Sequence, residues 1–261
     1  MPSGWLARMP DNPGSILRSA GVFLTAVMLL ATPALAEPTA VTVRVISQDA
    51  KFVGDSTGGA QVILRDAESG QVLSEGITTG GTGNTERIMQ SAGRSPLRAT
   101  DDAAAFHAML DIVRPTLVEL EVKGALGRPG SAVRVTAQRW MMPGVPVTVG
   151  DGWSIELPGL AVSPSVWIEP DGLQIAAKVE PMCGCPLTPD GLWDAGDYEV
   201  EASLWQADRE ERKVELAFAI SPGGFAGTLP LPKAGRYTLV LFARNRVTGS
   251  SGLGRIEVEV P

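Results

Sequence analysis

Hydrophobic and polar residues alternate in short segments from about residue 41 onward, and glycine and proline separate these segments. In VTVRVIS, Val41, Val43 and Val45 fall on one face. The same period of two returns in AQVILRD and QVLSEG, on either side of the turn 67–70. Alternation with such breaks is typical of half-buried strands joined by hairpins, so the pattern predicts an all-β fold.

Two later segments, 76–100 and 103–112, do not show a simple strand pattern. In AAAFHAMLDI (103–112), Asp101 could cap a helix, yet alternation places Leu110 on one face and His107 with Met109 on the other. We favour a strand, because the alternating segment RPTLVELEVKG follows at once. The preceding stretch, 76–100, is rich in glycine and polar residues, which predicts a long surface loop.

The stretch GAQVILRDAESGQVLSEGITT resembles the opening of the carboxypeptidase regulatory-like domain, a transthyretin-like β-sandwich. The shared features are Gly-Ala before a strand, an Asp-x-x-x-Gly turn, a second strand and Thr-Thr-Gly. The resemblance covers about 41–83 and extends toward residue 144. It implies a seven-stranded, non-catalytic sandwich, and the long polar loop departs from the family's pattern.

A second β-rich block follows the segment GVPVTVGDGWSIELPGL, which we interpret as a linker. In this block AGDYEVEASLW and AGRYTLVLFAR each enter a strand through Ala-Gly-x-Tyr, and the chain closes on a hairpin. A tyrosine at a strand entrance commonly anchors a sandwich corner, so we expect an immunoglobulin-like sandwich. The predicted organisation is a signal peptide (1–36), a transthyretin-like sandwich (37–145), a linker (146–163) and an immunoglobulin-like sandwich (164–261), which is two β-sandwich domains in tandem after a signal peptide.

The N-terminus has the features of an export signal. Arg18 precedes the apolar run AGVFLTAVMLLA, and the small-residue exit ATPALA predicts cleavage after Ala36. The run has about 12 residues, whereas a membrane-spanning helix needs about 20. We therefore expect a periplasmic or secreted protein with no membrane span after cleavage.

Charge and motifs exclude several functions. The chain of 261 residues has a formal net charge of −7, which disfavours binding to nucleic acid. His107 is the single histidine, and the sequence has no G-x-S-x-G elbow, Walker loop or dinucleotide fingerprint. The sequence therefore favours a non-catalytic protein over an enzyme.

Both cysteines lie in PMCGCP, and three interpretations compete. A Cys183–Cys185 disulfide would close almost no loop, so by the entropy model it would stabilise the fold little. A thiol-disulfide exchange pair suits an exported protein, but no cation nearby lowers the thiol pKa. As thiolates, Cys183 and Cys185 would form with the thioether of Met182 a soft ligand set that selects Cu(I).

We favour Cu(I), bound by Cys183 and Cys185 with Met182 as a weak third ligand. His107 and Met109 are further soft groups, whose simpler interpretation is an ordinary strand face. The predicted function is an exported binding or accessory protein that passes copper to a protein partner in the envelope. The alternatives are a thiol-disulfide exchange protein and a purely structural or partner-binding envelope protein.

Overall fold

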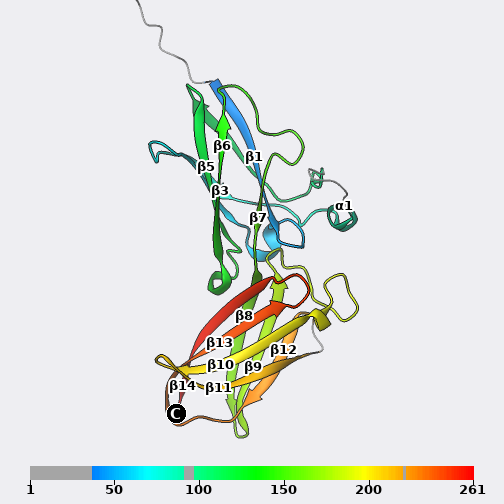
Figure 1. Cartoon of the computed structure of the whole chain (residues 1–261), viewed down its shortest axis with the longest axis vertical. Coiled ribbons are helices and arrows are strands. Elements are labelled where there is room, and N and C mark those ends of the chain that lie inside the picture. Colours follow the sequence, from blue (N-terminus) through cyan, green and yellow to red (C-terminus); the bar gives the residue numbers. More distant parts are fainter. Residues whose placement is uncertain (1–36, 91–96, 220–221) are drawn as a thin grey trace, which may run out of the picture. The chain divides into compact units, whose positions relative to one another are not determined.

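Fourteen β-strands account for most of the described chain, which comprises residues 37–90, 97–219 and 222–261 of a computed structural model (Figure 1). The single α-helix among these residues, α1 (Thr85–Met89), has five residues. The predicted all-β fold is therefore confirmed. The predicted signal peptide, 1–36, lies outside the described residues.

The N-terminal sandwich, residues 37–157, contains seven strands in two sheets. One sheet has the order β4-β1-β7, in which β1 pairs antiparallel with β4 and parallel with β7; the other has the order β3-β2-β5-β6. Valine, leucine and isoleucine from both sheets form the core between them. The strands are β1 (Glu37–Ser47), β2 (Gln61–Asp66), β3 (Val72–Ile77), β4 (Phe106–Ile112), β5 (Thr116–Gly124), β6 (Val133–Met141) and β7 (Trp153–Leu157).

Two local predictions in this sandwich are confirmed. Strands β2 and β3 form the predicted hairpin, and the segment that contains His107 is strand β4. The hairpin turn is held by the Asp66 carboxylate, which accepts hydrogen bonds from the backbone N–H groups of Glu68 and Ser69. These bonds favour the ionised form and lower the pKa of Asp66.

The structure differs from the predicted linker. Strand β7 lies within 146–163 and pairs with β1, so this segment supplies the seventh strand of the N-terminal sandwich. Strand β8 begins at Leu160, only three residues after β7 ends at Leu157. The glycines and prolines of this segment favour a linker in the sequence. The five residues of β7 among them alternate between inward and outward positions, which is too short a pattern to stand out.

The stretch predicted as a long surface loop contains more structure than expected. Helix α1 is capped by Asn84, whose side chain accepts a hydrogen bond from the N–H of Arg87. Ile88 of this helix packs with Phe52, Ala103, Ala104 and Ile46 in a small second core. Because Val45 points into the main core, its neighbour Ile46 points to the outer face of the β4-β1-β7 sheet. The loop therefore covers this outer face.

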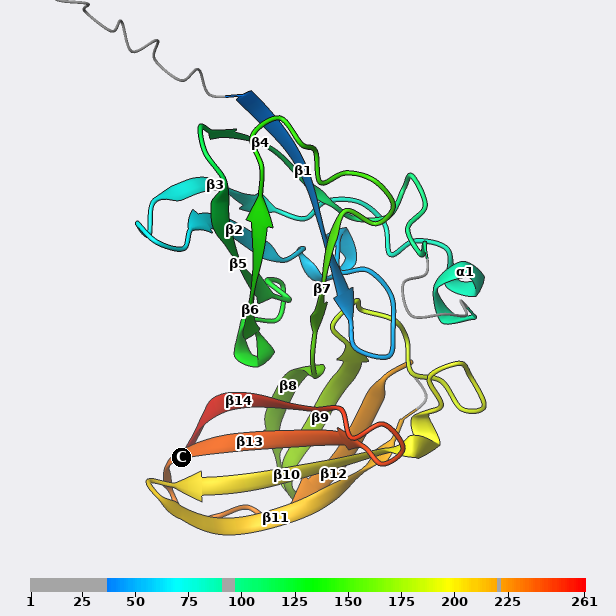
Figure 2. The same ribbon diagram turned by 45° about the horizontal axis from the view of Figure 1, so that its top comes forward.

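The C-terminal sandwich, residues 160–260, is built from seven antiparallel strands around one core (Figure 2). Their order is β14-β13-β10-β11-β12-β9-β8, and β11 joins β12 through only two residue pairs. The strands are β8 (Leu160–Glu169), β9 (Gly172–Pro181), β10 (Tyr198–Gln206), β11 (Arg209–Phe218), β12 (Gly224–Leu229), β13 (Gly235–Asn245) and β14 (Ser251–Val260).

The two Ala-Gly-x-Tyr segments enter neighbouring strands, β10 and β13. The Tyr237 hydroxyl donates to the backbone carbonyl of Lys233 at 2.9 Å, as a corner tyrosine is expected to do. Burial raises the pKa of Tyr198, against the opposing effect of a hydrogen bond with Asn245. The predicted role of tyrosine at these strand entrances is thus confirmed for Tyr237.

The described residues from Glu37 onward cluster as one compact unit, although the two sandwiches have separate main cores. Across the described ranges, no helix has the length and apolar character required to cross a bilayer.

Candidate functional site

The two cysteines lie in a turn directly after β9 and are bonded to each other. Their Cα atoms are 5.5 Å apart, within the usual range for a disulfide. Gly184, between them, has a φ of +75°, and its N–H donates to the carbonyl of Pro181 at 2.8 Å. Glycine adopts this left-handed conformation without steric cost, which allows residues two apart to approach this closely.

The disulfide is buried. Cys183 is 0% and Cys185 3% exposed, and both pack with Ala50 and Trp193. The Trp193 indole Nε1 donates to the backbone carbonyl of Asp49 at 3.0 Å, so the N-terminal sandwich contributes one wall of this cluster. Access of a thiolate or of a metal ion to either sulfur therefore requires the sandwiches to separate locally.

Side chains of the N-terminal sandwich also hydrogen-bond the turn itself. The Ser56 hydroxyl donates to the carbonyl of Cys183 at 2.7 Å, and the Thr57 hydroxyl donates to the carbonyl of Met182 at 3.1 Å. Both residues belong to a short 3₁₀ helix, Asp55–Thr57, more than 120 residues earlier in the chain. We call Ser56, Thr57, Glu180 and the turn 182–185 the joint.

Glu180 is the charged member of the joint. Its side chain is 3% exposed and lies between two cations: Oε1 is 2.7 Å from Arg128 Nη2, and Oε2 is 2.8 Å from Lys178 Nζ. Arg128 comes from the N-terminal sandwich, whereas Lys178 lies on β9 beside Glu180. A buried carboxylate with two cations and three donor contacts is compensated for its lost hydration.

Ser131 provides another polar contact between the sandwiches. Its hydroxyl accepts a hydrogen bond from the N–H of Val162 at 2.9 Å and lies 2.7 Å from the carbonyl oxygen of Leu253. Val162 is on β8 and Leu253 on β14, the two ends of the strand order in the C-terminal sandwich. One serine of the N-terminal sandwich thus bonds to both of the strands at the ends of this order.

The other predicted ligands lie elsewhere. Met182 is buried and packs in the core of the N-terminal sandwich. His107 lies on β4, where its Nδ1 is 3.2 Å from the Thr42 hydroxyl, and Met109 projects from the same strand with 59% of its surface exposed. The structure therefore brings Cys183 and Cys185 together without His107 or Met109. Among the described residues, no group of three or more histidine, cysteine, aspartate or glutamate side chains could hold a metal ion.

Sequence reasoning identified the cysteines but not the residues that surround them. Ser56, Thr57 and Arg128 lie in segments with no distinctive motif, and their partners are between 52 and 127 residues away. The one local signal was Glu180, a carboxylate between Val179 and Pro181 at the end of a strand whose last three residues are buried.

Comparisons with known proteins give little further information. No protein-family model matches the chain, and no curated protein resembles it in sequence. Among solved structures, one match is a DUF3823 family protein from Bacteroides ovatus ATCC 8483, with 9% sequence identity and a TM-score of 0.32. The match covers 86% of this chain and 100% of that chain. A likeness at this TM-score carries no argument about function.

Proposed function

We propose that this chain is an exported, non-catalytic accessory protein in which the Cys183–Cys185 turn joins two β-sandwiches into one binding body. The observation that carries the proposal is the burial of both sulfurs against Ala50 and Trp193, together with the hydrogen bonds from Ser56 and Thr57. The turn presents two carbonyl groups to the N-terminal sandwich, and the disulfide restricts the backbone that carries them. Because the bridge closes almost no loop, it restricts the unfolded chain little. Its stabilising effect therefore lies in the native contact between the turn and the N-terminal sandwich.

We further propose that the N-terminal sandwich is a carboxypeptidase regulatory-like module and the C-terminal one an immunoglobulin-like module. Seven strands in two sheets and the Asp66 hairpin turn support the first assignment. The tyrosine corner at Tyr237 supports the second. Modules of these types mostly present surfaces to partners, which favours a protein partner in the periplasm or outside the cell.

Binding of Cu(I) by Cys183 and Cys185 stays a prediction, and it concerns the reduced turn. Two molecules of an external thiol would reduce the disulfide to two cysteine thiols and become one disulfide themselves. The thiols would then lose their protons on binding Cu(I). Because both sulfurs are buried, this function also requires the joint to open.

Thiol-disulfide exchange stays a prediction on the same terms. Exchange begins with attack of an external thiolate on an accessible sulfur, and the burial of Cys183 and Cys185 disfavours such an attack. A structural disulfide needs no access once it has formed. The geometry therefore supports the joint better than it supports exchange.

The test is a parallel measurement of metal content and free thiols on the mature protein, purified from its exported fraction without chelator or reductant. A Cys183→Ser, Cys185→Ser double variant gives the background for both assays. We expect no copper above this background and no free thiol, even after denaturation. One copper per chain, with two thiols that react only after denaturation, would overturn the proposed structural role of the turn and support Cu(I) binding. Partly reduced, metal-free protein would also overturn this role and would support thiol-disulfide exchange.

A further inference from the structure

Two adjoining cavities lie beside the loop 97–102 and the segment 149–154, which leads into β7. The first has a volume of about 530 Å³, and its lining includes Arg98, Arg139 and Trp153. The second has a volume of about 630 Å³, and its lining includes Arg44. Both cavities are lined by Leu97 and Gly150, and Arg44 stands opposite Ser154, which lines the first cavity, in the β1–β7 register. We call the two together the arginine cavity.

Three of the four arginines that line this cavity differ from most others in the described chain; the fourth, Arg87, donates from its Nε to the carbonyl of Leu97 at 3.0 Å. Arg65, Arg114, Arg128, Arg134, Arg209, Arg244 and Arg246 each form an ion pair with a glutamate. In contrast, the side chains of Arg44, Arg98 and Arg139 form no ion pair with any described residue. Arg212, Arg236 and Arg255 also form no ion pair with a described residue, but they are exposed, whereas Arg44 and Arg98 are partly buried.

Buried donors in the cavity are unsatisfied as well. Within the described ranges, Arg44 Nε, Arg98 Nε and Thr100 Oγ1 have almost no exposed surface and no hydrogen-bond partner. A buried polar group without a partner costs on the order of 1–3 kcal/mol, and more when it is charged. Three such groups lie around one pair of cavities, and the guanidinium groups of Arg44 and Arg98 form no ion pair with a described residue, which together favour a polar ligand at this place.

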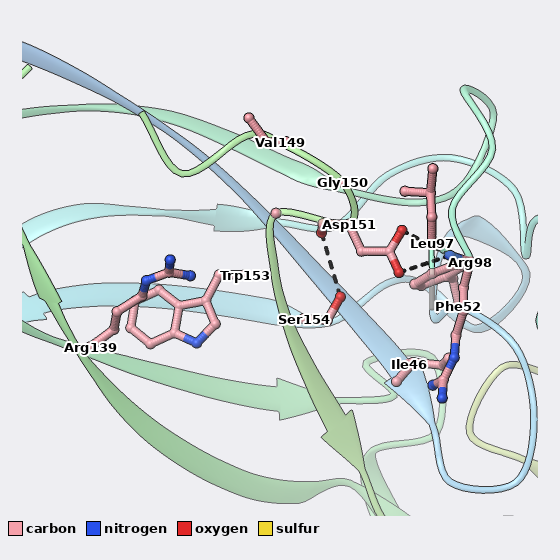
Figure 3. A pocket seen from close by; sticks show the side chains of 11 residues that line it. Ile46, Phe52, Leu97, Arg98, Arg139, Val149, Gly150, Asp151, Trp153 and Ser154 are labelled. Carbon is pink, nitrogen blue, oxygen red and sulfur yellow. Dashed lines mark hydrogen bonds between the residues drawn. The ribbon is translucent and has the colours of Figure 1, made fainter. Parts of the chain in front are cut away.

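The carboxylate that lines the first cavity, Asp151, already accepts hydrogen bonds from the chain. Asp151 accepts hydrogen bonds from the backbone N–H groups of Arg98 and Ala99, at 2.8–3.1 Å. In Figure 3, the Arg98 guanidinium extends away from this carboxylate toward Ile46. Asp151 therefore fixes the loop backbone and leaves the guanidinium of Arg98 without a counter-ion.

Two carboxylates in the second cavity restrict the kinds of ligand that could bind there. Asp101 and Asp102 line it together with Arg44 and Thr100. A simple anion would satisfy Arg44 and be repelled by the aspartates, whereas hydroxyl groups can donate to them. The lining therefore suits a molecule that carries both an oxyanion and hydroxyl groups.

We propose that the arginine cavity binds a hydroxylated oxyanion, which is the chemistry shared by sugar acids and sugar phosphates. Arg44 and Arg98 bind the carboxylate or phosphate through charge-assisted hydrogen bonds. Thr100, Asp101 and Asp102 bind the hydroxyl groups, and Arg139 provides additional positive charge beside Trp153. This proposal does not depend on the role of the cysteine turn.

Isothermal titration calorimetry of the mature, oxidised protein tests this proposal with three probes: sodium glucuronate, glucose 6-phosphate and neutral glucose. We expect saturable binding of at least one of the two anions and much weaker binding of glucose. Each of the substitutions Arg44→Gln and Arg98→Gln is expected to weaken anion binding by at least about tenfold, since each removes a charged hydrogen bond. Arg209→Gln, which changes an exposed arginine paired with Glu211, should leave the affinity unchanged.

The outcomes separate the two sources of the ligand. Binding of glucuronate alone identifies a sugar acid, and binding of glucose 6-phosphate alone identifies a sugar phosphate. The proposal is overturned if neither anion binds in the millimolar range, if glucose binds equally well, or if Arg44→Gln and Arg98→Gln both leave binding intact. Thr100→Val, which preserves the shape of the side chain, is the second test if either arginine variant fails to fold; it should weaken binding too.

Discussion

The joint and the arginine cavity both lie at the N-terminal sandwich and both contain buried polar groups, yet they satisfy these groups in opposite ways. At the joint, Glu180 has two cations, and the hydroxyls of Ser56 and Thr57 each donate to a carbonyl of the cysteine turn. In the cavity, Arg44 and Arg98 have buried nitrogen atoms without a partner in the described chain.

The difference separates groups that hold the fold from groups that face a ligand. A buried hydrogen bond within the chain is lost on unfolding, so removal of either partner lowers the free energy of unfolding. A buried donor without a partner already costs free energy in the native state, and its removal costs nothing further. The two regions should therefore respond in opposite ways to substitution.

The largest expected effect is at Glu180. Glu180→Gln keeps the shape of the side chain but leaves Arg128 without its counter-ion, and we expect the free energy of unfolding to fall by roughly 2 kcal/mol, since Lys178 is half exposed and can regain water. Urea denaturation measures this change. The control is Glu201→Gln, which removes an exposed pair with Lys213 and should cost less than about 1 kcal/mol. Equal losses for the two variants would contradict the role of the joint.

A second effect is expected at Gly184. A Cβ atom there would lie 2.8 Å from Thr57 Cγ2, whereas Gly70, with almost the same φ, has open space around it. Gly70→Ala therefore measures the cost of the left-handed backbone alone, about 1 kcal/mol. Gly184→Ala should cost more, because it also pushes the turn away from Thr57. Equal changes in melting temperature would show that the contact with Thr57 adds nothing to stability.

Alkaline pH gives a third and smaller effect, at Tyr198. Burial holds the pKa of Tyr198 above its ordinary value of 10.0, and the charges of Asp197 and Asp49 raise it further. Above pH 10 the unfolded chain releases this proton before the folded chain does, so stability is complete below pH 10 and declines as pH rises. Thermal unfolding of Tyr198→Phe should show a weaker decline between pH 9 and 11; identical profiles would contradict this assignment.

The smallest effect is expected in the cavity itself. Without ligand, Arg44→Gln should change the free energy of unfolding by no more than about 0.5 kcal/mol, or raise it slightly, because the buried Nε forms no hydrogen bond in the native state. The same denaturation assay applies. A loss as large as that of Glu180→Gln would mean that Arg44 stabilises the fold, and the contrast between the two regions would disappear.

The alternation of the first strand and the turn after Asp66 were sufficient to predict the all-β fold and the first hairpin, because both depend on residues close in sequence. The same reasoning placed His107 and Met109 on one strand face. It missed β7, because a short parallel strand is recognisable only beside β1, more than 100 residues earlier. It also missed helix α1, whose burial depends on Phe52 and Ala103.

By itself, the sequence determined the strand pattern and the close approach of Cys183 and Cys185, because both follow from neighbouring residues; the export signal stays a prediction. Only the tertiary structure decided that the cysteine turn contacts Ser56 and Thr57, and that the Nε atoms of Arg44 and Arg98 are buried without a hydrogen-bond partner among the described residues. Burial and pairing depend on what the folded chain brings together from distant segments. No local pattern contains that information.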